Sequence, residues 1–339
     1  MSMSNLASSD HQPFYRLLKT WQPVRFQGAN KKSRYFEGWY FKNVSADSAH
    51  IWSVIPGISI VDKNQAHAFI QLINGKTAET FYIKFPIGEF RFSEKKFEAH
   101  IGKNHFSFDG FSLDIDDESI DFSAKGQVNF EDVRRLKSTF FNPGIMGWYS
   151  FMPFMECYHG LVSMNHTLNG ELKINNQTCD FTGGKGYSEK DWGRSMPSAW
   201  IWLQCNHFET PGVSIMFSVA KIPFFRNAFT GFLCVMLFQG EIHRFATYTG
   251  AIISRIVLDE ESVFIFLNDN KFTVGITARR SGHGLLAAPV NGAMDRRIAE
   301  SVDATIVLKI SDKHGKLIFD ESGINAGLEL VGDMMDLPV

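Results

Sequence analysis

The sequence predicts an all-β protein made of two β-units. From Phe90 onward, short apolar alternations recur, and turn-forming Gly, Asn and Asp separate them at intervals of roughly ten residues. Helical periodicity is clear only at residues 13–21 and weaker at residues 294–300. The chain has 339 residues, of which 44% are hydrophobic, a size that suits two domains with a core each.

The alternation is most regular between residues 90 and 130. Apolar side chains occupy every second position there, so they share one face of each expected strand. This pattern is typical of an antiparallel meander. The positions are Phe90 and Phe92; Phe106 and Phe108; Phe111, Leu113 and Ile115; Ile120, Phe122 and Ala124; and Val128 and Phe130.

A short internal repeat indicates where the two units divide. Residues 39–43 (WYFKN) resemble residues 202–206 (WLQCN), and each segment precedes a polar turn and another apolar strand. The copies lie about half a chain apart, which favours two β-units of similar size. We therefore expect domains at residues 1–178 and 179–339, with the junction near Cys179.

Composition and motifs exclude several function classes. The formal net charge is −2 and no run of Lys and Arg exceeds a pair, so nucleic acid is not an expected partner. Phosphate-cradling GxGxxG and GxxxxGK[ST], zinc-binding HExxH and nucleophile-elbow GxSxG motifs are all absent from the sequence. We expect no cofactor and no metal.

The cysteines and the N-terminal residues favour a cytoplasmic protein. The four cysteines are irregularly spaced without a CxxC pair, which predicts reduced core residues. No basic region followed by an apolar run precedes Trp21, and the longest apolar stretch, residues 229–238, is too short to span a bilayer. A soluble or peripherally attached protein is expected.

One apolar segment, residues 140–155, breaks the strand rhythm. Pro and Gly interrupt it too often for a regular helix or strand. An apolar loop of this kind covers a cavity, touches a membrane or packs on the core. We favour a lid over an apolar pocket, and contact with a membrane surface is the next interpretation. Replacing Trp148 and Phe151 with Ser is then expected to weaken liposome binding.

Residues 185–193 (KGYSEKDWG) hold the richest mixture of ionisable and aromatic side chains. In a strand, Tyr187, Glu189 and Asp191 share one face, and Lys190 and Trp192 point to the other. A carboxyl group walled by aromatic rings loses water, which disfavours its charged form and suits it to donate a proton near neutral pH. The alternative is a salt-bridged strand whose tryptophans pack the core.

Two further acids lie in aromatic surroundings. Glu37 sits at the start of the first aromatic strand, and Glu156 closes the apolar loop. Burying a carboxylate without a partner costs several kcal/mol, so each acid is paired, protonated or exposed. The nearby His159 and His166 lie among apolar residues, which favours hydrogen-bonded core histidines over metal ligands.

At these residues the sequence resembles the tocopherol cyclase family and, through it, a group of two-barrel lipocalin-like enzymes that includes carotenoid 1,2-hydratases. The similarity extends over nearly the whole chain. Asp191 departs from the pattern, which has Asn before Trp-Gly, and residues 157–159 read Cys-Tyr-His where the plant-like pattern has Pro-His-Trp. The matching pieces are residues 35–41, Gly147-Trp148, Pro153, Glu156, residues 187–193, Pro197, Trp200, Trp202, Gln204, Asn206, Ala288-Pro289 and residues 323–332.

The resemblance implies two lipocalin-like antiparallel β-barrel domains with few short helices, and a cofactor-independent cyclase of the isomerase class. In the implied reaction, a proton is delivered to an isoprenoid double bond of a prenylated quinol or phenol. A phenolic oxygen of the same molecule then captures the cation and closes a chromanol ring. This chemistry needs an acid in a dry pocket and aromatic faces that stabilise positive charge.

The resemblance also suggests roles for individual residues. Glu189 is the expected proton donor with Tyr187 as its partner, and His159, Glu156 or Asp191 orients or recharges it. The alternatives are a carrier that holds a lipophile unchanged and a hydratase in which water captures the cation. The expected substrate-binding residues are Glu37, Trp39, Trp148, Tyr158, Trp192, Trp200 and Trp202.

Overall fold

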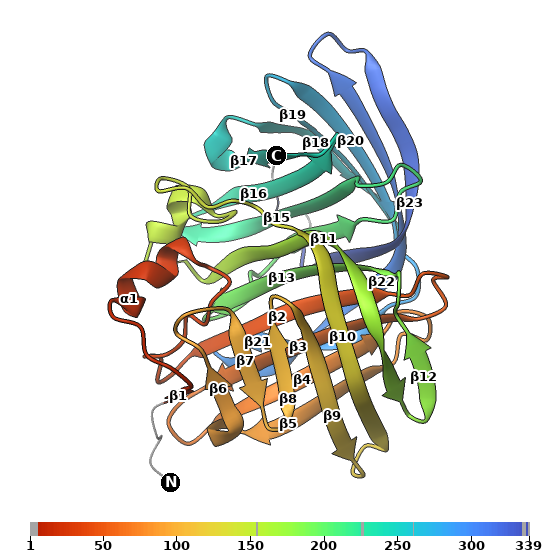
Figure 1. Cartoon of the computed structure of the whole chain (residues 1–339). Coiled ribbons are helices and arrows are strands. Elements are labelled where there is room, and N and C mark those ends of the chain that lie inside the picture. Colours follow the sequence, from red (N-terminus) through yellow and green to blue (C-terminus); the bar gives the residue numbers. More distant parts are fainter. Residues whose placement is uncertain (1–5, 154, 225–226, 260, 334–336, 338–339) are drawn as a thin grey trace. The chain divides into compact units, whose positions relative to one another are not determined.

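The computed structural model describes residues 6–153, 155–224, 227–259, 261–333 and 337. This part of the chain is all-β, as the alternation predicts, and its strands form two antiparallel-rich sheets (Figure 1). The described helical segments are single turns: α1 (Tyr15–Leu18), η1 (Lys19–Trp21), η2 (Ile87–Glu89), η3 (Gly147–Phe151) and η4 (Thr247–Thr249).

The first sheet has the order β1-β6-β7-β8-β9-β10-β11-β13-β2-β3-β4-β5, with β12 paired to β11. Its run from β6 to β10 is the predicted meander, since each strand pairs antiparallel with the next. Its strands are β1 (Ala7–Ser8), β2 (Tyr35–Val44), β3 (Ile51–Ile60), β4 (Ala66–Asn74), β5 (Thr80–Pro86), β6 (Phe90–Phe92), β7 (Glu98–Ile101), β8 (Asn104–Ser107), β9 (Gly110–Asp117), β10 (Phe122–Arg134), β11 (Cys157–Ile174), β12 (Gln177–Asp180) and β13 (Lys185–Gly193).

The second sheet has the order β17-β16-β15-β14-β23-β22-β20-β19-β18, with β21 paired to β22. Its strands are β14 (Trp200–Cys205), β15 (Ser214–Phe224), β16 (Asn227–Phe238), β17 (Glu241–Ala246), β18 (Ile252–Leu258), β19 (Ser262–Asn268), β20 (Phe272–Arg279), β21 (Gly284–Val290), β22 (Ala293–Asp312) and β23 (Leu317–Val331).

Two closed barrels are not confirmed. A barrel requires its first and last strands to pair. Among the described strands, β1 and β5 end the order of the first sheet, and β17 and β18 end the order of the second. Both sheets are therefore open.

The chain folds into two compact units. One comprises residues 1–74, 79–196 and 286–297, and the other residues 75–78, 197–285 and 298–339. Because β13 pairs with β2 and β11, the first unit extends beyond the expected junction at Cys179. The repeated aromatic segments lie on β2 in the first unit and β14 in the second.

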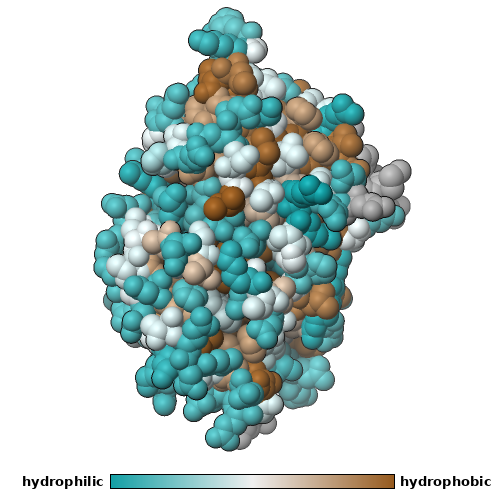
Figure 2. Space-filling model, turned by 90° about the vertical axis from the view of Figure 1, so that its right-hand side faces the viewer, coloured by the Kyte–Doolittle hydropathy of each residue, from teal (hydrophilic) through white to brown (hydrophobic). Residues whose placement is uncertain are grey.

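Each unit has its own hydrophobic core. The first is rich in aromatic rings: Trp39 and Phe97 stack at 5.3 Å between ring centroids, and Phe41 lies beside Phe97. The second is mainly aliphatic and includes Ile201, Leu203 and Phe217. One face of the molecule is predominantly hydrophilic, with apolar side chains in small groups (Figure 2).

The weak helical pattern at residues 294–300 is wrong. These residues lie in the first half of β22, a strand to which β21 is paired, and the pairing of β22 with β23 begins at Glu300. Strand pairing outweighs a weak local helical preference. The pattern at residues 13–21 is confirmed only as the short segments α1 and η1. None of the described helices has the length and hydropathy needed to span a bilayer.

Candidate active site

The acid-rich strand β13 is a central strand of the first sheet. Its neighbours are β11 and β2, with Asp191 opposite His159 on one side and Gly38 on the other. Most side chains of β13 are buried on both faces, by His159 and Tyr187 on one and by residues 23–27 and Trp39 on the other. The predicted burial of this motif is thus a consequence of its place in the sheet.

Side chains of β13 alternate between the two faces. Tyr187, Glu189 and Asp191 lie on one face, and they meet His159 from β11. Lys190 lies on the other face and contacts Trp192. The ionisable side chains of the motif therefore belong to two separate polar clusters, with Glu189 and Asp191 in one and Lys190 in the other.

The first cluster is centred on His159. Its Nδ1 lies 2.9 Å from Asp191 Oδ1, and its Nε2 lies 3.4 Å from Glu189 Oε2. The second contact is an ion pair without the alignment of a hydrogen bond. The Tyr187 hydroxyl donates to the same Glu189 oxygen at 2.5 Å. One imidazole ring thus bridges two carboxylates, and the Tyr187 hydroxyl is a further proton-bearing group beside Glu189.

Electrostatics favour the charged form of this imidazole. Burial is the largest single influence and lowers the pKa of His159, but Glu189 and Asp191 together raise it well above its usual value. Burial, followed by the negative charge of Glu189, raises the pKa of Tyr187 well above its usual value. The cluster therefore holds an imidazolium and a neutral phenol against the Glu189 carboxyl group.

The same three residues offer one metal-ligating atom each, within 4.8 Å of one another. However, the two carboxylates contact opposite nitrogens of the ring. One imidazole cannot turn both nitrogens toward a single ion, so this geometry is that of a hydrogen-bonded imidazolium.

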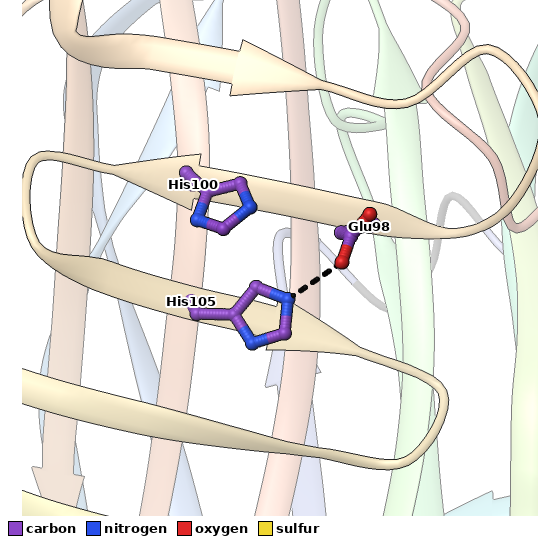
Figure 3. A group of neighbouring side chains, drawn as sticks. All are labelled: Glu98, His100 and His105. Atoms are coloured by element: carbon purple, nitrogen blue, oxygen red, sulfur yellow. Dashed lines mark hydrogen bonds and ion pairs between the residues drawn. The ribbon is translucent and has the colours of Figure 1, made fainter. Parts of the chain in front are cut away.

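A second group with metal-ligand chemistry lies on the β7–β8 hairpin (Figure 3). His105 Nε2 lies 3.1 Å from Glu98 Oε1, and the His100 and His105 rings stack at 4.5 Å. The ammonium of Lys96 also lies 3.2 Å from that Glu98 oxygen and competes with any cation. We assign no ion to it.

The opposite face of β13 carries a fully buried ion pair. Lys190 Nζ lies 2.6 Å from Glu37 Oε1. The Tyr35 hydroxyl donates to the other Glu37 oxygen at 2.5 Å, and the backbone N–H of Gln27 donates to both oxygens. Glu37 thus takes the paired option among the three expected for a buried acid.

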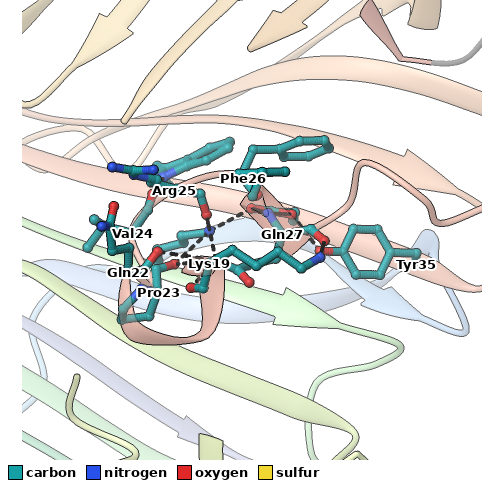
Figure 4. Close-up of polar contacts among 12 residues, drawn as sticks. Lys19, Gln22, Pro23, Val24, Arg25, Phe26, Gln27 and Tyr35 are labelled. Atoms are coloured by element: carbon teal, nitrogen blue, oxygen red, sulfur yellow. Dashed lines mark hydrogen bonds and ion pairs between the residues drawn. The ribbon is translucent and has the colours of Figure 1, made fainter. Parts of the chain in front are cut away.

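Backbone carbonyls complete the environment of Lys190. Its ammonium donates to Pro23 O at 2.9 Å and to Arg25 O. The Gln27 side-chain amide donates to the Arg25 carbonyl at 3.0 Å, so this segment curls with its carbonyls inward (Figure 4). Burial lowers the pKa of Lys190 to about 8, although Glu37 opposes the shift.

Aromatic rings surround this ion pair. The Lys190 ammonium lies 4.9 Å from the Trp39 ring and 4.7 Å from the Trp192 ring. Tyr158 stacks parallel to Trp192 at 5.5 Å. Tyr158 and Trp192 also line a pocket of about 580 Å³ in the first unit. The other lining residues are Lys19, Thr20, Gln27, Lys31, Ser33, Arg34, Tyr35, Ser150, Pro153, Met155, Gly193 and Arg194.

Comparison with known proteins places these residues in a family. Residues 121–332, more than half of the chain, match the family model described as tocopherol cyclase-like. The chain belongs to the tocopherol cyclase-like family. It is 24% identical over 200 residues to the chloroplastic tocopherol cyclase of Zea mays, and 23% identical over 196 residues to the probable chloroplastic tocopherol cyclase of Oryza sativa subsp. japonica. These matches cover 55% of this chain but only 41% and 42% of the relatives, so they span less than half of those proteins.

Solved structures support the fold of this family member over nearly its whole length. CghA bound to Sch210972 has a TM-score of 0.57, covering 98% of this chain and 96% of that one, at 10% identity. A Nitrosomonas europaea protein described as AttH has a TM-score of 0.51, covering 96% of this chain and 98% of that one, also at 10% identity. At this identity the similarity concerns the fold alone.

The remaining candidate residues lie outside the His159 cluster. Glu156 Oε1 is paired with Arg194 at 2.7 Å, and Trp148 lies on η3 with 46% of its surface exposed. Trp200 and Trp202 belong to β14 of the second unit, where Trp200 Nε1 donates to Glu329 at 2.5 Å. Glu37 and Trp39 lie on the face opposite the cluster.

Sequence reasoning missed the partner of Glu37. The sequence places Lys190 on the face opposite Glu189 and Asp191 but does not pair it with Glu37, although a buried carboxylate requires a partner. The available signal was the alternation itself, which turns Lys190 away from Glu189 and Asp191. What the pattern lacked was the identity of the neighbouring strand that carries Glu37.

Proposed function

We propose that the protein catalyses the cyclisation of a prenylated quinol or phenol by proton transfer, with the His159 cluster as its proton-transfer site. The observation that carries the proposal is the placement of Glu189 between the Tyr187 hydroxyl and the His159 ring. Membership of the tocopherol cyclase-like family supports a cyclase at the level of the family.

Each group has a distinct task in the proposed reaction. The His159 imidazolium passes a proton to the Glu189 carboxylate, and Glu189 delivers it to one carbon of the isoprenoid double bond. The phenolic oxygen of the substrate bonds to the adjacent cationic carbon. The phenolic proton is released to the cluster, so the product is an isomer of the substrate. The released proton restores the His159 imidazolium, and Asp191 holds the ring through Nδ1.

The surroundings suit such chemistry. The exposed fractions of the His159 and Glu189 side chains are 12% and 7%, so little water competes for a cation formed beside them. Tyr187 is fully buried and fixes the orientation of the Glu189 carboxyl group. A dry site with fixed proton donors stabilises charge more strongly than water does.

The test is turnover of a geranylgeranyl or phytyl benzoquinol by purified protein. Glu189→Gln should lower kcat by roughly 10²- to 10⁴-fold, the usual range for a general acid. Glu171→Gln removes an exposed carboxylate from β11 and should leave kcat unchanged. Equal melting temperatures would show that both variants fold. Full activity of Glu189→Gln would remove Glu189 from the donor role.

The product distinguishes the cyclase from its alternatives. In D₂O a cyclase product is an isomer of the substrate that carries one deuterium in place of a hydrogen, on the protonated carbon. A hydratase product additionally carries the mass of one water. A ligand that is bound but returned unchanged would identify a carrier.

A further inference from the structure

The pocket that Tyr158 and Trp192 line has a strongly positive lining. Lys19, Lys31, Arg34 and Arg194 line it, and no carboxylate is among its described lining residues. It lies on the face of β13 opposite the His159 cluster, because Trp192 and Asp191 alternate along the strand. The pocket is therefore separate from the proposed catalytic site.

Two of these cations remain available to a ligand. Lys31 lies over the Tyr35 ring at 5.5 Å, and no carboxylate partner of Arg34 occurs among the described residues. Arg34 adopts φ 46°, a left-handed conformation that is unfavourable for a non-glycine residue, and its N–H donates to Val61 O at 3.0 Å. By contrast, Arg194 is paired with Glu156.

An exposed aromatic surface adjoins the pocket. Trp21 contacts Phe140 and Phe151 at ring-centroid distances of 5.8 and 5.5 Å, which joins the N-terminal segment to the apolar loop. In Figure 1 the red α1 lies beside the yellow-green turn of η3. The exposed fractions are 70% for Phe140, 77% for Phe141 and 46% for both Trp148 and Phe151.

The same two segments form part of the pocket wall. Thr20 comes from η1, and Ser150 and Pro153 come from the apolar loop. The positive lining and the exposed aromatic rings are thus continuous in the first unit. Aromatic side chains that insert at the headgroup level, next to Lys and Arg, are typical of surfaces that bind anionic bilayers.

We propose that this surface docks on an anionic bilayer, with the phosphate of one lipid headgroup in the pocket. Lys31 and Arg34 would hold the phosphate, and the rings of residues 140–151 would enter the interface. This inference does not depend on the chemistry of the His159 cluster. It goes beyond a general membrane contact of the loop, because it names the headgroup site.

The first test is sedimentation with phosphatidylcholine vesicles, with and without phosphatidylglycerol. Wild-type protein should bind the anionic vesicles more tightly, and Lys31→Gln/Arg34→Gln should weaken that binding by about tenfold or more. Lys63→Gln/Lys173→Gln removes the same charge from exposed sites elsewhere in the first unit and should have a much smaller effect. Equal losses in both double variants would overturn the headgroup site.

A second pair of variants tests the aromatic surface. Trp148→Ser/Phe151→Ser should release the protein from vesicles. Ile252→Ser/Ile324→Ser, which changes side chains of comparable exposure on the second unit, should not. Unchanged binding of the first variant would overturn membrane docking and return the loop to a lid or core role.

Inorganic phosphate separates a lipid ligand from a free anion. Phosphate at about 10 mM is added to the wild type and to the variant that lacks Arg34, and the melting temperatures are compared. If phosphate raises the melting temperature only when Arg34 is present, and vesicles do not bind, the pocket takes a soluble anion and the lipid proposal fails. Turnover of a short-chain substrate without vesicles is measured in parallel. Lost vesicle binding with retained turnover in Lys31→Gln/Arg34→Gln would separate this proposal from the proposed cyclase function.

Discussion

The Lys190 ammonium and the Glu37 carboxylate form a 2.6 Å ion pair whose two side chains are fully buried. Each charge also has hydrogen-bond partners from the chain, namely the carbonyls of Pro23 and Arg25 for Lys190 and the N–H of Gln27 for Glu37. A buried charge is tolerated only when it is paired and its hydrogen bonds are satisfied. The pair ties residues 23–27 to the centre of the sheet.

Breaking this pair should destabilise the first unit severely. Lys190→Met leaves the Glu37 carboxylate buried without its counter-ion, and we expect a loss of about 3–5 kcal/mol in the free energy of unfolding. Glu37→Gln should cost a similar amount, and the double variant should cost clearly less than the sum. Urea denaturation of the four proteins measures the coupling. Additive losses would contradict an energetically coupled pair.

His159 predicts a stability that declines with rising pH. Its pKa in the folded protein is well above the unfolded value of 6.5, so its contribution is fully present below pH 6.5 and is lost as the pH rises through the folded pKa. The difference in unfolding free energy between wild type and His159→Gln should shrink by up to about 1.4 kcal/mol per pH unit in that window. A difference that is constant above pH 6.5 would show that the ring is not held as an imidazolium.

Gly186 leaves room for a buried histidine. The two residues are paired in register between β13 and β11, and a Cβ on Gly186 would lie 2.1 Å from His166 Nε2. Gly186→Ala should therefore destabilise the protein by roughly 1–3 kcal/mol. In a His166→Ala background the same change should cost much less, as measured by thermal denaturation. Equal costs in both backgrounds would mean that the clash is relieved elsewhere.

Chelation tests the reading of the His159 cluster as an imidazolium. Dialysis against EDTA should leave turnover unchanged, since both ring nitrogens already contact carboxylates. Activity that is lost and then restored by zinc would contradict this prediction. His105→Asn is the control, because it removes the hairpin group without touching β13.

The strands were predictable where their pattern was local. Alternation from Phe90 to Phe130 predicts the meander because neighbouring strands are joined by short turns. The helical prediction for residues 294–300 was wrong because these residues are part of the long strand β22, and strand pairing decided their conformation. Barrel closure also failed as a prediction, since it depends on whether two remote edge strands meet.

The candidate site was predictable in its components. The alternation placed Tyr187, Glu189 and Asp191 on one face, and His159 was among the expected partners. The sequence offered Glu156 equally with His159 as the group that orients or recharges Glu189, but the Glu156 carboxylate is paired with Arg194. Nothing in the sequence around Arg194 distinguishes those two outcomes, because the pairing depends on side-chain placement across two strands.

The sequence by itself determined that Glu189 and Lys190 point to opposite faces of one strand, because a period of two is a property of the local backbone. Only the tertiary structure decided that β11 brings His159 to one face and β2 brings Glu37 to the other. His159 precedes Glu189 by 30 residues, and Glu37 precedes Lys190 by about 150, on the order of a whole domain. Strand pairing at such distances is set by the packing of the entire sheet.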